Sequence, residues 1–202
     1  MATVRRAILE DVPAIGDALN RALVDDPFVR WLVSPNAPAA GRRAYVRLML
    51  EKIALPRGIV DAAFVEDRVA GAALWAPPGT FDLGLVDTIF MLPWLVRAVG
   101  LTRLLGVADA LASVDAARPA EPRWLLTLIG TLPDHRRRGI GAALLSHGVE
   151  RCDEHGAPAV LETAHEPNLT FYERFGFEVT SKRTLLPDGP PSWTLVRRAG
   201  GS

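Results

Sequence analysis

The sequence predicts an α/β domain, more specifically an α+β mixed sheet: a mostly antiparallel central sheet with one parallel strand pair, flanked by helices. Three observations predict this class. A pair of β-prone runs at 59–79 is separated by a short polar turn. A buried strand, a helix and a second buried strand follow one another over 123–164, as in a parallel crossover unit. Two further β-prone runs close the chain. Together they favour helices packed on a mixed sheet.

The first part of the chain predicts a short strand, two helices and a hairpin. The stretch "TVRRA" at 3–7 alternates as a strand does, and 10–26 has helical apolar spacing with Asp11 as a candidate cap. Residues 25–38 contain three prolines and predict a loop with one helical turn. A second helix is expected over 39–55, ended by "PRG". The hairpin then occupies 59–79.

The second part predicts alternating strands and helices. Residues 80–118 are expected to be mostly helical, broken by Pro93 and glycines. The run "EPRWLLTLIGTLP" at 121–133 is nearly all apolar or β-branched, as a strand buried on both faces is. A helix at 139–156 with Gly156 as its C-terminal cap, a strand at 157–164 and a short helix at 166–177 follow. Closing strands are expected at 177–186 and 191–198.

Composition limits the class of function. Lys+Arg and Asp+Glu both number 23, so the net charge is zero and a general nucleic-acid binder is disfavoured. The single cysteine, Cys152, excludes an internal disulfide framework, and with no signal-like run near the start it favours a cytoplasmic location. Residues 83–101 contain Asp87, Pro93 and Arg97, which favours a buried or lid-forming helix over a membrane span.

The most informative stretch is "LPDHRRRGIGAALL" at 132–145, where three arginines run into two glycines at a helix start. Free amides and the positive end of the helix dipole bind phosphates there, and glycines let the backbone approach the anion. A P-loop is excluded because Ala142 and Ala143 follow Gly141. A dinucleotide fingerprint is weakened by Leu144 at its third glycine position, although Glu162 lies at a suitable distance. A glycine-rich helix start with a solvated basic run is the remaining structural alternative.

The third phosphate motif is Arg/Gln-x-x-Gly-x-Gly/Ala, satisfied by Arg136, Gly139 and Gly141. This pattern resembles the acetyl-CoA loop of the GNAT N-acetyltransferase superfamily. A second motif, "EPNLTFYERFGFEV", supplies Asn168, Tyr172 and a Gly-Phe pair in the order and at the separation that GNAT proteins have. Residues 119–198 are most similar to the puromycin N-acetyltransferase branch, and the likeness is looser over 1–118.

The resemblance implies a single GNAT domain over 1–202, with its parallel strand pair splayed apart. Acceptor-side elements would occupy about 1–118, the acetyl-CoA core about 119–182, and the closing strands 175–198. Acetyl would pass directly from acetyl-CoA to an amine, with no covalent enzyme intermediate. The expected cofactor contacts are Leu128, Ile129, Gly130, Thr131, Arg136, Arg137, Arg138, Gly139, Ile140, Gly141, Ala142, Asn168 and Tyr172. Gly130, near the end of its strand, is suited to a bulge or a splay.

The catalytic roles follow in part from the same resemblance. Tyr172 is expected to be the general acid for the departing thiolate. No acid lies on the strand before the phosphate loop, so the base stays open between Glu162 and His165, with a water chain as a further alternative. Asp25 and Asp26 are candidates to attract the amine. Aromatic residues expected to wall the acceptor site are Trp31, Trp75, Phe81 and Trp94.

The predicted function is N-acetylation of a small-molecule amine, such as an antibiotic or an aminonucleoside, by a monomer or homodimer with no metal, nucleic-acid or membrane partner. One alternative is an enzyme that acetylates protein N-termini or lysines. Another is a CoA-binding regulatory module without catalysis.

Overall fold

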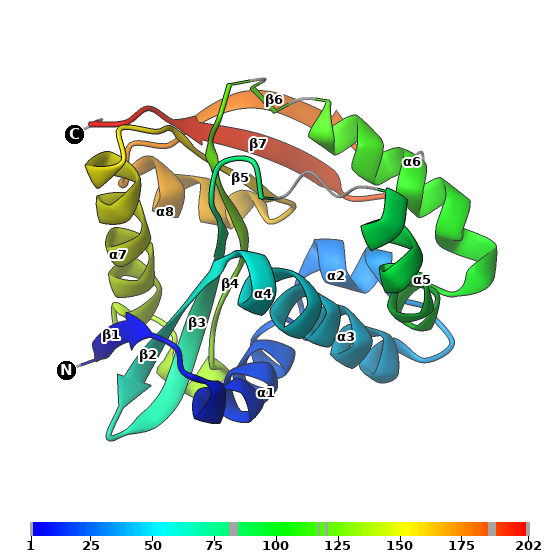
Figure 1. The fold of residues 1–202 in the computed structure, drawn as a ribbon, viewed down its shortest axis with the longest axis horizontal. Helices are drawn as coiled ribbons and strands as arrows, with labels where there is room; N and C mark the ends of the chain where they lie inside the picture. Colours follow the sequence, from blue (N-terminus) through cyan, green and yellow to red (C-terminus); the bar gives the residue numbers. More distant parts are fainter. Residues whose placement is uncertain (1, 81–84, 117, 120, 186–188, 201–202) are drawn as a thin grey trace.

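The computed structural model describes residues 2–80, 85–116, 118–119, 121–185 and 189–200. Within them, seven strands form one sheet in the order β1-β2-β3-β4-β5-β7-β6 (Figure 1). Paired strands run antiparallel except β4 and β5, which are parallel, so the predicted mixed sheet is confirmed. The strands are β1 (Thr3–Arg6), β2 (Ile59–Val65), β3 (Arg68–Ala76), β4 (Trp124–Thr131), β5 (Ala159–Thr163), β6 (Glu178–Thr184) and β7 (Pro191–Arg197).

The helices flank this sheet and connect its strands. They are α1 (Val12–Ala22), α2 (Pro27–Leu32), α3 (Pro38–Arg47), α4 (Leu55–Arg57), α5 (Leu85–Val99), α6 (Leu104–Asp115), α7 (Ile140–Glu154) and α8 (Leu169–Glu173). Short 3₁₀ turns are η1 (Leu9–Asp11), η3 (Leu101–Arg103), η4 (Pro133–His135) and η5 (Glu166–Asn168), and η2 (Leu48–Ala54) is π-helical. The single helix expected over 39–55 is therefore α3 followed by a π-helical segment, and Asp11 accepts a hydrogen bond from the Ile8 amide rather than capping α1.

Alternate residues of the central strands face two separate cores. Ala72 and Leu74 of β3 pack with Leu19 of α1, whereas Ala73 and Trp75 pack with the residues of α7. This division follows from the twofold alternation of side chains along a strand. Helix α1 and the π-helical segment therefore cover one face, and α7 covers the other.

Helix α7 is held to its face by a close approach and an ion pair. A Cβ added at Gly148 would lie 2.3 Å from the Trp75 ring, so the helix backbone rests directly on the indole. Asp61 of β2 is fully buried and accepts from Arg151 of α7 at 2.9 Å. The start of α7, which carries the arginine-glycine stretch, is thereby fixed relative to β4.

Helices α5 and α6 extend beyond the end of the sheet (Figure 1). Ala98, Val99 and Val107 pack on Leu32 and Ala44 of α2 and α3. In the described part of the chain no single helix is long and apolar enough to span a membrane. The helical segments Met91–Val99 and Leu101–Ala110 reach that length and hydropathy only when taken together, and the pair is bent by 98°.

The contact between Gly148 and Trp75 generates a stability prediction. Gly148→Ala should lower the free energy of unfolding by roughly 1–3 kcal/mol, because overpacking a filled core displaces the indole or the helix. Gly16→Ala in α1 is the matched control, since its new Cβ would meet only Leu50 Cδ2 at 3.9 Å. Urea denaturation followed by circular dichroism measures both. Equal stability of the two variants would contradict the close packing of α7.

Candidate functional site

The two parallel strands separate near their carboxyl ends. Pairing between β4 and β5 stops at Leu126 and Leu161, although β4 continues to Thr131. A register shift against β3 lies between Leu126 and Leu128, so the bulge falls at Thr127. Of the bulge or splay expected at Gly130, the bulge lies at Thr127 instead, whereas Gly130 does lie in the part of β4 that has separated from β5. Gly130 stays paired with Ala72, and its missing Cβ makes room for Ala22 and Leu19 of α1. Beyond Leu126, the edge of β4 that faced β5 has no strand partner among the described residues.

A cavity of about 900 Å³ opens where the strands separate. Most of its wall is apolar, and the lining residues come chiefly from α2, α3, η2, α5 and α6 together with β4 and β5. Its titratable side chains come from five different parts of the fold. They are Asp26, Tyr45, Asp115, Arg118, Glu162 and Tyr172.

Tyr172 is positioned in this cavity by a short aromatic-rich helix. It lies on α8, is 5% exposed, and has its ring centroid 5.1 Å from that of Phe171 and 6.2 Å from that of Phe177. Burial raises the pKa of the Tyr172 phenol, and the Asp26 carboxylate raises it further. The phenol is therefore protonated at neutral pH and can act as a proton donor.

Asp26 is a half-buried carboxylate in the same cavity. Its Oδ1 accepts from the Val29 amide at 2.9 Å, so it caps α2. Burial raises the pKa of Asp26, while the Val29 amide, the nearby His165 and the Phe28 amide each lower it in part. Among the described residues, no salt bridge involves Asp26. A cation entering the cavity therefore meets a carboxylate that has no salt-bridge partner among the described residues.

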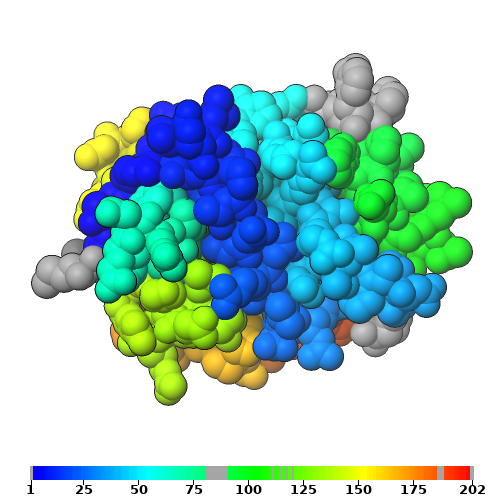
Figure 2. Space-filling view, turned by 90° about the horizontal axis from the view of Figure 1, so that it is seen from below, coloured from blue at the N-terminus to red at the C-terminus, as the bar shows by residue number. Residues whose placement is uncertain are grey.

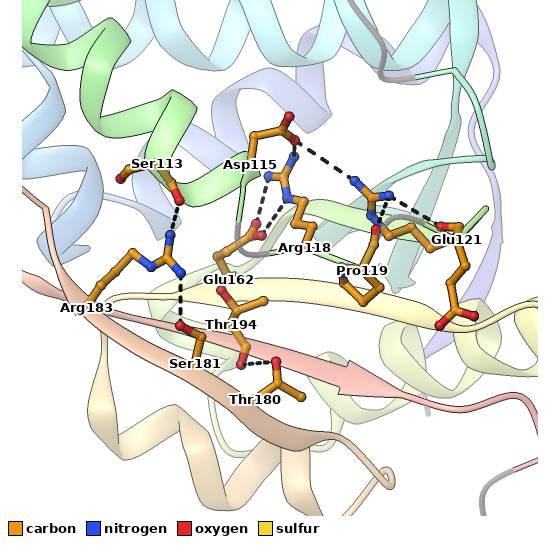
Figure 3. A network of polar contacts seen from close by, with 11 residues as sticks. Ser113, Asp115, Arg118, Pro119, Glu121, Glu162, Thr180, Ser181, Arg183 and Thr194 are labelled. Carbon is orange, nitrogen blue, oxygen red and sulfur yellow. Dashed lines mark hydrogen bonds and ion pairs between the residues drawn. The ribbon is translucent and has the colours of Figure 1, made fainter.

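Glu162 also lines the cavity, but it is paired. Arg118 Nε donates to Glu162 Oε1 at 2.6 Å and its Nη2 to Oε2 at 3.0 Å (Figure 3). Arg118 Nη1 also donates to Asp115 at 2.8 Å. Burial opposes the charge of Arg118, and the two carboxylates outweigh it and raise the pKa of Arg118. Both oxygens of Glu162 are thus engaged with the guanidinium.

His165 and Asn168 lie at the entrance to η5 and α8. His165 is exposed and does not line the cavity; its Nδ1 is 3.3 Å from Asn168 Oδ1. Asn168 does line the cavity, next to the residues of β5. The two base candidates predicted from the sequence are therefore in different settings, one ion-paired and one at the surface.

The arginine-glycine stretch lies outside the cavity, at the start of α7. Gly139 has φ +78° and Arg137 has φ +60°, both left-handed, and Gly139 is the N-terminal cap. The first intrahelical bond is donated by Ala143 to Gly139, so the amides of Ile140 to Ala142 have no acceptor within the helix. Arg137 and Arg138 are exposed, while Arg136 donates to the Ala22 carbonyl at 2.9 Å. Figure 2 shows this loop in yellow-green and α5–α6 in green, with the blue N-terminal segments between them.

Three of the predicted wall residues are elsewhere. Trp75 lies in the core beneath α7, Trp94 lies beside Arg47 and Lys52 on a separate groove, and Trp31 packs on Phe28 and Arg103 without lining the cavity. The direction of each side chain depends on its position in the strand or helix. Adjacent residues of β3 face opposite sides of the sheet, so Trp75 points away from the cavity and into the core beneath α7. Asp25 is exposed and also lies outside the cavity. Phe81 is outside the described residues.

Sequence reasoning missed the aromatic wall that is present. Phe28 and Tyr45 line the cavity, with ring centroids 6.4 Å apart. The chain has only two tyrosines, Tyr45 and Tyr172, and both line this cavity. The sequence shows that tyrosine is rare, but it does not show that the two side chains lie in one cavity. Arg118 was missed because nothing in its sequence context links it to Glu162, 44 residues later.

The donor side fits coenzyme A. The open edge of β4 offers backbone groups to an extended pantetheine, as it would to an added strand. The left-handed Gly139, where a side chain would be strained, and the amides after it give the start of the 15-residue α7 the features of an anion cradle. The predicted residues Leu128 and Ile129 line the cavity, and Gly130 and Thr131 continue β4 toward the cradle.

Comparisons with known proteins agree with this geometry. A crystal structure from Corynebacterium glutamicum, titled histone acetyltransferase HPA2 and related acetyltransferase, superposes with a TM-score of 0.75 at 29% identity, over 98% of this chain and 97% of that one. A Drosophila melanogaster polyamine N-acetyltransferase that forms N-acetylagmatine has the same fold, with a TM-score of 0.62, 14% identity and coverage of 98% and 100%.

The mycothiol acetyltransferase of Corynebacterium aurimucosum is 36% identical over 61 residues, which are 29% of this chain and 20% of that enzyme. The chain thus matches only a fifth of that curated relative. The model of the acetyltransferase (GNAT) family matches residues 26–177, well over half of the 202 residues. The chain belongs to the acetyltransferase (GNAT) family.

Proposed function

We propose that this protein transfers acetyl from acetyl-CoA to the amine of a small molecule. The observation that carries the proposal is the cavity itself. The parted end of β4, the buried Tyr172 and the Asp26 carboxylate all border one space of about 900 Å³. That size suits a small molecule rather than a polypeptide segment.

The donor would lie along β4 and end at the helix start. Backbone groups of Leu128 to Thr131 would hold the pantetheine, and the amides of Gly139 to Ala142 would hold the pyrophosphate. Arg136, Arg137 and Arg138 add positive charge beside it. Acetyl-CoA supplies an activated acyl carbon when bound. An amide from the stretch Leu128 to Gly130 would polarise the carbonyl.

The acceptor side is assigned to Asp26 and the leaving-group side to Tyr172. Asp26 attracts the ammonium and takes its proton, because a raised pKa makes a carboxylate a better base. Tyr172 gives a proton to the departing sulfur. Glu162 and His165, our sequence candidates for the base, are less suited, since one is held by Arg118 and the other is exposed. Asn168 would orient the donor or a water at the cavity edge.

Protein acetylation is the second candidate, because the C. glutamicum structure is titled a histone acetyltransferase. The cover formed by α5 and α6 over the cavity favours the small amine. A CoA-binding module without catalysis is disfavoured by the presence of Tyr172. Aminonucleosides such as puromycin belong among the amines to be tested, since the C-terminal motifs resemble that branch. We further treat the chain as one catalytic domain, acceptor elements before about 118 and donor elements after it, acting in the cytoplasm.

The activity test is acetyl-CoA-dependent release of free thiol with a panel of amines, including puromycin, and with histone-tail peptides. We expect release with at least one small amine and none with the peptides. Tight acetyl-CoA binding without release for any acceptor would instead support the non-catalytic module.

Tyr172→Phe should lower kcat by about a hundredfold or more, because a positioned general acid contributes on that order. Acetyl-CoA affinity, measured by calorimetry, should change little, since the ring packing on Phe171 and Phe177 is kept. Phe175→Tyr, which adds a hydroxyl nearby on the same segment, should not restore turnover to that variant. Full activity of Tyr172→Phe would remove the phenol from the acid role.

Asp26→Asn should lower kcat/KM for the amine by roughly thirtyfold or more, as removing a buried charge partner does. Asparagine caps helices well, so α2 should be retained. In the wild type, kcat/KM should fall as the pH drops through the Asp26 pKa, which burial raises above its usual range, because protonation removes the carboxylate. In the Asp26→Asn variant, kcat/KM should not show this fall at acidic pH, which is the acid limb of the pH profile. An unchanged acid limb in the variant would place the titrating group elsewhere.

A further inference from the structure

The cavity holds three carboxylates, but they differ in whether a guanidinium already neutralises them. Glu162 and Asp115 both accept from Arg118, at 2.6 Å and 2.8 Å. Asp26 has a backbone amide and no salt bridge among the described residues. Within the described lining, Asp26 is thus the one carboxylate available to a cation.

Arg118 is held in place tightly enough to act as a fixed counter-ion. Its side chain is 10% exposed, that of Glu162 is 18% exposed, and the contact uses both oxygens of the carboxylate. Figure 3 shows the guanidinium between the end of α6 and β5, with Arg183 reaching from β6 to the Ser113 carbonyl beside it. A second cation near Glu162 would meet this positive charge.

Most of the cavity wall other than these charged residues is apolar. The segment η2 and the helices α5 and α6 contribute side chains without charge: Leu48, Met49, Ile53, Met91, Leu95, Ala98, Val99 and Val107. An ammonium buried against such a wall loses its hydration and gains no counter-ion. Burial raises the pKa of the Tyr45 phenol, and the Asp26 and Glu162 carboxylates raise it further, so Tyr45 remains a neutral phenol there.

We infer that Arg118 is a specificity-determining residue, which neutralises the second acidic position of the cavity so that the acceptor is an amine with one positive charge on an apolar body. Diamines and polyamines, which carry a second ammonium, are excluded by Arg118 and the apolar wall. This inference rests on the proposed acetyltransferase function and narrows its substrate class. It also separates this chain from the polyamine N-acetyltransferase that shares its fold.

The first test compares n-hexylamine with hexamethylenediamine, two amines of equal length that differ by one ammonium. Thiol release by the wild-type protein should give a kcat/KM at least about tenfold higher for the monoamine, because uncompensated like charges cost more than 1.4 kcal/mol. Equal or faster acetylation of the diamine would overturn the inference while leaving the acetyltransferase function intact. No release with any amine would instead overturn the proposed function.

The second test removes the counter-ion. Arg118→Gln should expose the charge of Glu162 and lower the monoamine-to-diamine ratio of kcat/KM by about tenfold or more. Arg118→Lys keeps the positive charge and is the matched control; its ratio should stay near the wild-type value. A folded Arg118→Gln protein with an unchanged ratio, or an equal loss in Arg118→Lys, would overturn the assignment.

The third variant covers the case in which Arg118→Gln does not fold. Glu162→Gln removes the negative charge and keeps the arginine, so the ratio should rise, because a second ammonium then meets a less compensated cation. A fall in the ratio would contradict the role of Arg118. Thermal unfolding and acetyl-CoA binding of each variant distinguish a specificity change from a general loss of structure.

Discussion

The parting of β4 and β5 is the constraint on which the rest of the molecule depends. Two parallel strands that stay paired leave no room between them, whereas here the ladder ends at Leu126 and Leu161. The bulge at Thr127 turns β4 away while its other edge stays bonded to β3. One strand can therefore serve both as a central element of the sheet and as an open edge for an extended ligand.

The helices α7 and α8 follow the two separating strands, β4 and β5, in the chain. Residues 132–139 connect the end of β4 to the start of α7, so the left-handed Gly139 turn follows the open edge along the chain. Helix α8 follows β5 and carries Tyr172 to the other side of the same gap. The packing of Gly148 on Trp75 and the buried Asp61–Arg151 pair fix α7, so the cradle does not depend on its own glycine-rich loop for its position.

Charge in the cavity is controlled by neighbours that are remote in sequence. Asp26, at the start of α2, and Glu162, near the end of β5, have the same kind of functional group. Asp26 accepts a hydrogen bond from the Val29 amide, whereas Glu162 forms an ion pair with Arg118, just after the end of α6. The two carboxylates therefore present different charges to the cavity, because the ion pair with Arg118 offsets the charge of Glu162.

The local sequence determined the elements, the phosphate motif and the family resemblance, because periodicity, glycine placement and helix starts are local properties of the chain. It also placed Tyr172, Asp26 and Glu162 among the candidates. Only the tertiary structure decided that Trp75 is core, that Tyr45 and Phe28 form the wall, and that Glu162 is paired with Arg118. The physical reason is that strand phase and the pairing of distant charges depend on how elements pack, and no local pattern contains that information.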